Sequence, residues 1–166
     1  IAVNPIAIIP ILFEDTKEKV IRKAEEIMKE VMKFNPFIDA REEYTPGFKY
    51  NDWEMKGIPL RIEIGPKDLE KEQCVFVRRD NNEKIIVKIR DVDKKAEEIL
   101  NSIQENLFKR AQRLLYDNIA ESDRINDVKK IIKNKKIAFT PLCKSRECED
   151  VLKVETEGAK VLSIPD

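Results

Sequence analysis

Histidine is absent from the 166 residues, and its absence removes several kinds of chemistry. The chain can build neither a Ser-His-Asp nor a Cys-His nucleophilic centre, and it offers no imidazole to a metal. It also lacks the side chain that ordinarily titrates near neutral pH. Ordinary hydrolase chemistry is therefore disfavoured by composition alone.

Long apolar runs are missing as well. No stretch approaches the roughly 20 residues that span a bilayer, and the start, IAVNPIAIIPIL, lacks the charged region and cleavage site of a signal peptide. We expect a cytoplasmic protein with no membrane contact. Because the chain begins with Ile and with an apolar stretch that looks like a strand already under way, we also expect a piece of a longer protein.

An excess of charge of either sign is absent too, since 32 Lys and Arg residues balance 32 Asp and Glu residues. The chain lacks the global positive charge of a nonspecific nucleic-acid binder, so any contact with RNA or DNA must be local. Cysteines number only three. In a cytoplasmic chain they argue against a disulfide framework and leave buried thiols or metal ligands as the interpretations.

Hydrophobic periodicity predicts an α/β fold with a mixed sheet of about five strands flanked by helices. The predicted strands are residues 6–12, 37–42, 60–64, 74–77 and 85–89. Apolar residues at helical spacing predict a helix after the first strand, a brief helix at residues 51–56 and a long helix from Asp93. The expected organisation is one domain over residues 1–92, a long connecting helix over 93–122 and a small α+β region over 123–166.

The segment Thr45 to Asp68, TPGFKYNDWEMKGIPLRIEIGPKD, contains three of the four glycines, three of the eight prolines and the only tryptophan. Its Pro and Gly pairs are turn signals, so we expect a turn, a short helix, a turn, a strand and a turn. The strand alternates Leu, Arg, Ile, Glu, Ile, which predicts Arg61 and Glu63 on its outward face. Glu54, Arg61, Lys67 and Asp68 then converge near the end of this strand, where α/β sheets tend to bind ligands.

These residue types suit the Watson–Crick edge of guanine. A carboxylate can accept from its N1–H and N2–H2 groups while Arg or Lys donates to O6. Phe48, Tyr50 and Trp53 are local candidates for stacking on unpaired bases. The alternatives are that the mixed charges form solvated ion pairs and that Trp53 belongs to the core.

Residues 39–80, DAREEYTPGFKYNDWEMKGIPLRIEIGPKDLEKEQCVFVRRD, closely resemble the anticodon-binding domain of prolyl-tRNA synthetase, a class II aminoacyl-tRNA synthetase. The TPG turn, the string K-x-x-x-W-E-x-K-G-x-P-x-R-x-E-x-G-P-x-D and the V-x-R-R-D hairpin occur in order and at the family's spacing. The tail around Cys143 and Cys148 resembles the C-terminal zinc-binding domain of the archaeal and eukaryote-like type. Together these features cover nearly the whole chain.

The resemblance implies a function in translation. Such ligases activate proline with ATP and Mg and attach it to tRNA(Pro), and this domain docks on the anticodon loop to read two guanines. The residues at the family's guanine-contacting positions are Glu54, Arg61, Lys67 and Asp68. Asp39 and Arg41 match an aspartate-arginine strand motif and are candidates for neighbouring contacts or supporting ion pairs, and Trp53 joins them as a candidate anticodon contact.

The cysteine pair has two interpretations. Cys143 and Cys148 are separated by four residues, which is compatible with half of a tetrahedral zinc site, and the family has a second pair that this sequence does not reach. Free thiols are the alternative. Cys74 lies in a predicted strand and is interpreted as buried.

The resemblance also implies what lies elsewhere. The class II catalytic motifs and their ATP-binding arginines belong to a catalytic domain that should precede Ile1, so the chain alone should not catalyse aminoacylation. We expect that domain and the tRNA(Pro) anticodon loop as partners, and a homodimer in the parent enzyme. Two alternatives stay open: a regulatory or protein-interaction module with the same fold, and a stand-alone α/β enzyme that uses Glu54 and Glu63 as acid and base.

Overall fold

The computed structural model describes residues 3–143 and 145–162. The chain divides into two compact units, Ile1–Leu107 and Phe108–Asp166. The division falls within one long helix, and each unit is described by itself below.

The first unit is built on a five-stranded mixed sheet, as the periodicity predicts. Its strands are β1 (Ile6–Pro10), β2 (Phe37–Ile38), β3 (Leu60–Ile64), β4 (Gln73–Arg78) and β5 (Lys84–Lys88). Their order across the sheet is β2-β1-β3-β4-β5. The strand β1 runs parallel to both of its neighbours, β2 and β3, whereas β4 runs antiparallel to β3 and to β5.

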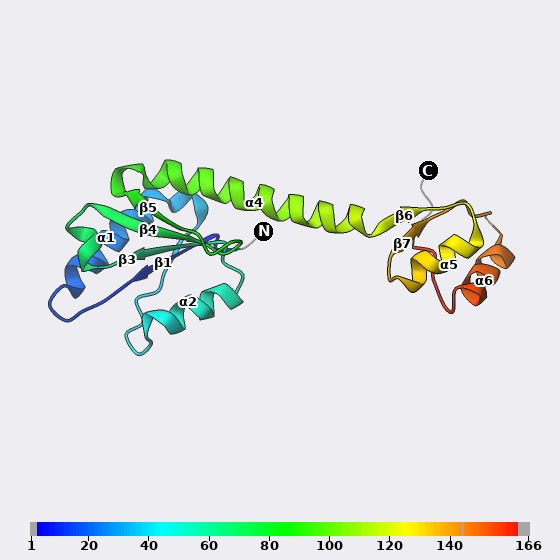
Figure 1. The fold of residues 1–166 in the computed structure, drawn as a ribbon. Coiled ribbons are helices and arrows are strands. Elements are labelled where there is room, and N and C mark those ends of the chain that lie inside the picture. The colour runs from blue at the N-terminus through cyan, green and yellow to red at the C-terminus, as the bar shows by residue number, and fades with distance from the viewer. Residues whose placement is uncertain (1–2, 144, 163–166) are drawn as a thin grey trace. The chain divides into compact units, whose positions relative to one another are not determined.

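Helices cover both faces of this sheet (Figure 1). They are α1 (Lys17–Glu30), α2 (Pro46–Met55), α3 (Pro66–Leu69) and α4 (Val92–Asp117), with short 3-10 turns η1 (Met32–Phe34) and η2 (Ile89–Asp91). In Figure 1, α1 and α4 lie on one side of the strands and α2 lies on the other. The apolar core fills the first of these sides, where alternate residues of the strands meet α1 and α4.

The core follows from the strand and helix periods. Ile8, Ile62 and Phe76 are fully buried on the same side of neighbouring strands. Ala24 of α1 and Ala96 of α4 are buried against this layer, and their small side chains let both helices approach the sheet closely. Burying a large apolar side chain such as Ile62 or Phe76 contributes about 1.5–3 kcal/mol.

The expected turn at Pro46-Gly47 is instead the beginning of α2, which starts five residues before the predicted helix. The hydroxyl of Thr45 accepts a hydrogen bond from the backbone N–H of Phe48 at 3.3 Å. Proline follows this N-cap at the first helical position, where its fixed φ suits the helix and its missing N–H costs nothing. Gly57, with a φ of 84°, ends the helix in a conformation that disfavours other residues.

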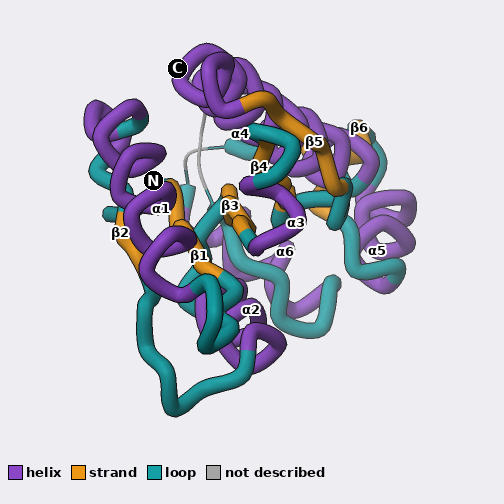
Figure 2. Tube along the Cα trace, turned by 90° about the vertical axis from the view of Figure 1, so that its left-hand side faces the viewer, coloured by secondary structure: helices purple, strands orange, loops and turns teal. Residues whose placement is uncertain are grey.

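The expected strand over residues 37–42 is also shorter than predicted, since β2 ends at Ile38. A loop then leads from β2 to α2, and Figure 2 shows it descending beside the sheet. Asp39 turns inward at the start of this loop, and its contacts are described with the site.

The second unit is a small α+β arrangement. Its elements are β6 (Ile119–Glu121), α5 (Ile125–Lys133), β7 (Ile137–Phe139) and α6 (Arg146–Glu155). The two strands pair in parallel. The helix expected over residues 93–122 ends at Asp117, because the chain beyond it pairs with β7 and the N–H of Ile137 donates to Asn118 at 2.7 Å. None of the helices in the described part of the chain is long and apolar enough to cross a membrane.

A buried ion pair joins the β4–β5 hairpin to α4. Arg78 donates two hydrogen bonds to Asp80, at 3.0 and 2.8 Å, and a third to the hydroxyl of Ser102 at 3.1 Å. Asn106 donates to the same carboxylate at 2.6 Å. The side chain of Asp80 is 1% exposed, and its bond to Arg78 lowers the pKa of Asp80 despite burial.

We predict that Arg78→Ala destabilises the fold strongly, because it removes the two charged hydrogen bonds that Arg78 donates to the buried carboxylate of Asp80. The free energy of unfolding should fall by about 3–5 kcal/mol in urea denaturation. Arg90→Ala is the matched control, since the Arg90 side chain is 85% exposed, and it should change stability by less than about 0.5 kcal/mol. Equal losses in the two variants would contradict this account of the hairpin.

Candidate nucleic-acid interface

The helix α2 covers a polar strip of the sheet. The alternation of β3 predicts that Arg61 and Glu63 face outward, with no buried carboxylate among them. They do lie opposite the apolar core, but they are only 9% and 6% exposed, because α2 lies over this side (Figure 1). The expectation of outward exposure is therefore wrong, and a buried charged cluster takes its place.

Arg61 is the centre of this cluster. Its Nη1 lies 2.6 Å from Oε1 of Glu54 on α2, and its Nε lies 2.9 Å from Oε1 of Glu63 on β3. Its guanidinium also sits 4.2 Å from the centre of the Tyr50 ring. The structure thus brings the predicted pair of Glu54 and Arg61 together and holds the arginine rigidly. Because Glu63 is engaged by Arg61, the arrangement gives no support to paired carboxylates acting as acid and base.

Tyr50 forms the helix side of the same cluster. Burial and, after it, the neighbouring carboxylate of Glu63 raise the pKa of its hydroxyl to about 12, although Arg61 acts to lower it. The hydroxyl therefore stays protonated at any physiological pH and remains a hydrogen-bond donor. Tyr50 packs under Arg61 rather than presenting an open ring.

The second predicted pair lies at the far end of β3. Asp68 accepts a hydrogen bond from the backbone N–H of Gly65 at 3.0 Å and lies 3.4 Å from the amide nitrogen of Gln73. The expected Gly-Pro turn is thus the capped start of α3. Lys67 is exposed beside it. Since Arg61 and Gly65 are four strand residues apart, the two predicted pairs are separated by about 13 Å along β3.

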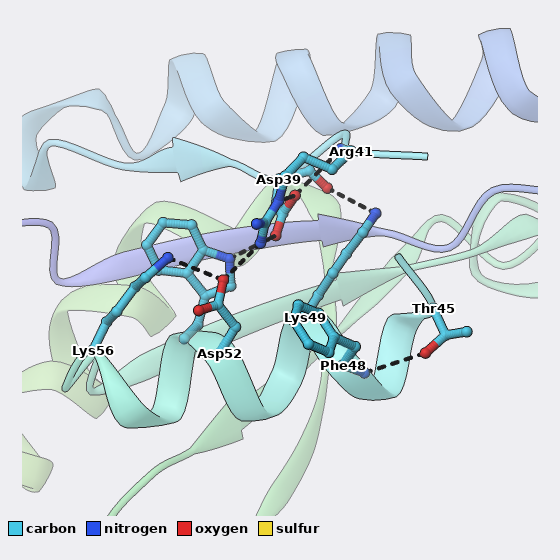
Figure 3. Close-up of polar contacts among 8 residues, drawn as sticks. Asp39, Arg41, Thr45, Phe48, Lys49, Asp52 and Lys56 are labelled. Carbon is cyan, nitrogen blue, oxygen red and sulfur yellow. Dashed lines mark hydrogen bonds and ion pairs between the residues drawn. The ribbon is translucent and has the colours of Figure 1, made fainter. Parts of the chain in front are cut away.

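Asp39 is a fully buried anchor for α2 (Figure 3). Its carboxylate accepts from Arg41 at 2.9 and 2.7 Å and from the indole N–H of Trp53 at 2.8 Å. Arg41 also reaches Asp52 of α2 at 2.7 Å, and Lys49 donates to the Asp39 carbonyl at 3.3 Å. Burial by itself would raise the pKa of Asp39, but the bonds from Arg41 and Trp53 lower it to about 2.

Trp53 packs into the protein instead of offering both ring faces to a ligand. One neighbour is Phe37 of β2, with ring centres 4.8 Å apart, and another is Lys56, whose ammonium lies 4.5 Å from the ring centre. Together with its bond to Asp39, these contacts join α2 to the edge of the sheet. The geometry gives Asp39, Arg41 and Trp53 supporting positions.

Two exposed rings stack at the start of α2; sequence reasoning named Phe48 as a stacking candidate but missed its neighbour Tyr44. Tyr44 and Phe48 are stacked with centres 4.4 Å apart and planes 14° from parallel, and Arg41 lies 4.8 Å from the Tyr44 ring centre. The two rings are 39% and 49% exposed. Their spacing of four residues is a signal for side-by-side placement on a helix, although Tyr44 lies just outside this helix.

The cysteines separate into two kinds. Cys74 is buried in the core, and burial raises its pKa to about 12. Near the start of α6, the Cys143 thiol lies 3.4 Å from the hydroxyl of Ser145. Interaction with the Cys148 thiol lowers the pKa of Cys143 and raises that of Cys148. Within residues 3–143 and 145–162, no three His, Cys, Asp or Glu side chains gather as a metal site. The two thiols equal in number half of the ligands of a tetrahedral zinc site.

Comparison with known proteins decides the family of the sheet-bearing unit. Residues 5–106 match the family model described as "Anticodon binding domain". The chain belongs to the anticodon binding domain family. This family assignment fits the mixed five-stranded sheet and the helices on both of its faces.

Similar proteins extend the likeness beyond this domain. The chain is 37% identical over 179 aligned residues to a bifunctional glutamate/proline--tRNA ligase of Cricetulus griseus, with 99% of the chain and 12% of that protein covered. It is 36% identical over 160 residues to a proline--tRNA ligase of Natranaerobius thermophilus, covering 95% of the chain and 33% of the relative. A proline--tRNA ligase of Thermococcus kodakarensis is 38% identical over 169 residues, covering 99% and 34%. The chain thus spans about a third or less of these relatives.

The depressed pKa of Asp39 makes the anticodon-binding domain acid-sensitive in a defined way. Because the folded pKa of about 2 lies below the ordinary value of 3.8, Asp39 stabilises the fold above that ordinary value. This stabilisation is lost as the pH falls through the folded pKa. Between about pH 5 and about pH 2, the wild-type free energy of unfolding should therefore fall by about 2 kcal/mol more than that of Asp39→Asn.

Urea denaturation across this range checks the prediction. Glu70→Gln is the control, since Glu70 is an exposed carboxylate at the end of α3, and it should keep the wild-type pH dependence. If the free energy of unfolding depends on pH identically in wild type and Asp39→Asn, the assignment of Asp39 as the anchor of α2 is wrong.

Proposed function

We propose that this chain reads the anticodon of tRNA(Pro) as part of a proline–tRNA ligase. The observation that carries the proposal is the contact of 2.6 Å between Glu54 and the buried Arg61, in a chain of the anticodon binding domain family. The likeness to proline--tRNA ligases over 95–99% of the chain supports the same conclusion.

The Arg61 cluster suits a guanine edge. Glu63 and Tyr50 hold Arg61 from below, while the Glu54 side chain is 38% exposed and can be reached from solvent. Its carboxylate accepts from the N1–H and N2–H2 groups of guanine, and an N–H of Arg61 donates to O6. Because Arg61 is already ordered, binding loses little side-chain entropy.

Lys67 and Asp68 form the second reading pair. Asp68 keeps its bond to the Gly65 backbone and offers Oδ1, which Gln73 contacts only at 3.4 Å, and the exposed ammonium of Lys67 serves O6 of a second guanine. Adenine fails at both pairs, because it presents an acceptor at N1 where guanine presents a donor. The carboxylate oxygen that faces this acceptor gains no hydrogen bond from the base in exchange for its lost water, which is costly.

The remaining parts of the parent enzyme are proposed from the resemblance. A catalytic domain outside this chain uses ATP with Mg²⁺ to activate proline, and the enzyme works as a homodimer in the cytoplasm. The chain contributes RNA recognition to that reaction and positions Asp39, Arg41 and Trp53 as supports for α2. Its balanced charge of 32 cations and 32 anions is consistent with recognition by local contacts rather than by general attraction to RNA.

Binding of anticodon stem-loops tests the proposal. The 166-residue chain should bind a stem-loop with two anticodon guanines more tightly than one with adenines at those positions, as measured by fluorescence anisotropy. Glu54→Gln should reduce this preference by about 1–3 kcal/mol, or roughly 5- to 150-fold, because an amide cannot accept from both guanine donors.

The control for this measurement is Lys29→Ala, which removes an exposed cation near the end of α1. It should change overall affinity slightly and leave the guanine preference intact. A wild-type chain that binds both stem-loops equally would refute anticodon reading and favour a protein-interaction role for the fold.

We also propose that Cys143 and Cys148 supply two ligands of a zinc site that other residues of the parent enzyme complete. The proximity of the two thiols supports this, and zinc bound there would lock the start of α6 in place. The described residues supply only these two ligands, so they do not fit a complete site by themselves.

Metal content of the purified parent enzyme checks the zinc proposal. Changing both cysteines to serine should remove about one zinc per chain, whereas Cys74→Ala should leave the zinc content unchanged, because Cys74 is buried in the core. Unchanged zinc in the double variant would overturn the assignment.

A further inference from the structure

We infer that the open face of β4 and β5 beside α2 is a platform for an unpaired base of the RNA loop, with Lys84 contacting a phosphate. The platform consists of Val75, Ile86 and Lys84. The inference rests on the proposed function. The platform contacts the face of a base rather than its edge, and it holds the RNA between the two guanine-reading pairs, Glu54 with Arg61 and Lys67 with Asp68.

The strand register places the platform directly beside the Arg61 cluster. Glu63 pairs with Val75, and Val75 pairs with Ile86, so the three residues form one row across the sheet. In the next row, Arg61 and Lys84 both pair with Val77. Because paired residues point to the same face of a sheet, all of these side chains lie on the face that α2 partly covers.

Exposure rises sharply along the first of these rows. Glu63 is 6% exposed, Val75 is half-buried and Ile86 is 66% exposed. The cover that α2 gives to β1 and β3 thus does not extend to β5. An isoleucine this exposed on an edge strand is a risk for aggregation. Contact with an apolar ligand accounts for its exposure.

The spacing of the two reading pairs calls for such a surface. Glu54 with Arg61 and Lys67 with Asp68 lie about 13 Å apart along β3, whereas stacked neighbouring bases are about 3.4 Å apart. Two bases that reach both pairs must therefore be unstacked from each other. Their apolar faces then need contacts with the protein to replace the lost base stacking. Val75 and Ile86 lie at the level of Glu63, between the two pairs.

The charges on β5 favour RNA over a second copy of the chain. Lys84 and Lys88 flank Ile86 on the same face, and lysines on an edge strand oppose pairing with another strand. The Lys84 side chain is 62% exposed and lies 3.8 Å from Glu63, so its ammonium is at the border of the platform. A cation beside an apolar floor matches a nucleotide, which has a flat base and a phosphate.

Two variants of the platform test the inference in the 166-residue chain. Ile86→Asp and Ile86→Ala should weaken binding of the two-guanine stem-loop by about 5- to 10-fold, with the aspartate causing the larger loss. The ratio of guanine to adenine affinity should stay close to the wild-type ratio, because Ile86 contacts no base edge. Lys84→Ala should reduce the slope of log K against log salt by about one.

Val154→Ala and Val154→Asp are the matched controls, since Val154 is 77% exposed on α6, and both should bind as wild type does. Urea denaturation of the Ile86 variants should give wild-type midpoints, as expected for an exposed position. Wild-type RNA affinity in both Ile86 variants would overturn the inference.

The inference would also be overturned if the Ile86 variants lost self-association in ultracentrifugation but kept their RNA affinity, because the face would then bind a second copy of the chain. If the wild-type chain shows no preference for the two-guanine stem-loop over the adenine stem-loop, the proposed function itself is refuted.

Discussion

The placement of Arg61 between two carboxylates is the interaction on which the candidate site depends. A guanidinium that is 9% exposed is costly to remove from water unless its donors are satisfied. Glu63 satisfies it from the same strand, and Glu54 satisfies it only if α2 lies across the sheet. The burial cost of one charge thus fixes the position of a whole helix. Replacing this cluster with apolar residues could hold α2 equally well, but it would leave no group to recognise a base.

The other buried charges keep that helix in register from its opposite side. Asp39 accepts hydrogen bonds from Arg41 and Trp53. Arg41 also forms an ion pair with Asp52 of α2. The helix therefore has polar contacts both to the loop that follows β2 and to β3. Such contacts depend steeply on geometry, which gives the half-exposed Glu54 a defined location. A helix held by apolar packing alone could slide by a fraction of a turn with less penalty.

Much of the fold could be predicted from the sequence, because strand and helix periods are local properties. The alternation of Leu60 to Ile64 predicted a strand with one apolar face, and the structure agrees. It could not reveal that the polar face is covered, since the cover is α2, and its position depends on contacts with residues distant in sequence. Thr45-Pro46-Gly47 was ambiguous for a related reason. The same three residues suit a turn and a capped helix start, and only the residues that follow decide between them.

Among the site residues, too, some could be predicted from local sequence and others depend on the whole fold. Chemistry alone suggested Glu54 with Arg61, and the structure brings them into contact. Chemistry alone could not distinguish Trp53 as a stacking ring from Trp53 as a donor to a buried carboxylate, because burial is set by the whole fold. Ile86 carried no signal in the sequence, since an apolar residue in a strand is expected to be buried. Its exposure has meaning only beside the rows formed by Arg61 and Glu63, so recognition by this sheet depends on which strands the helix α2 leaves uncovered.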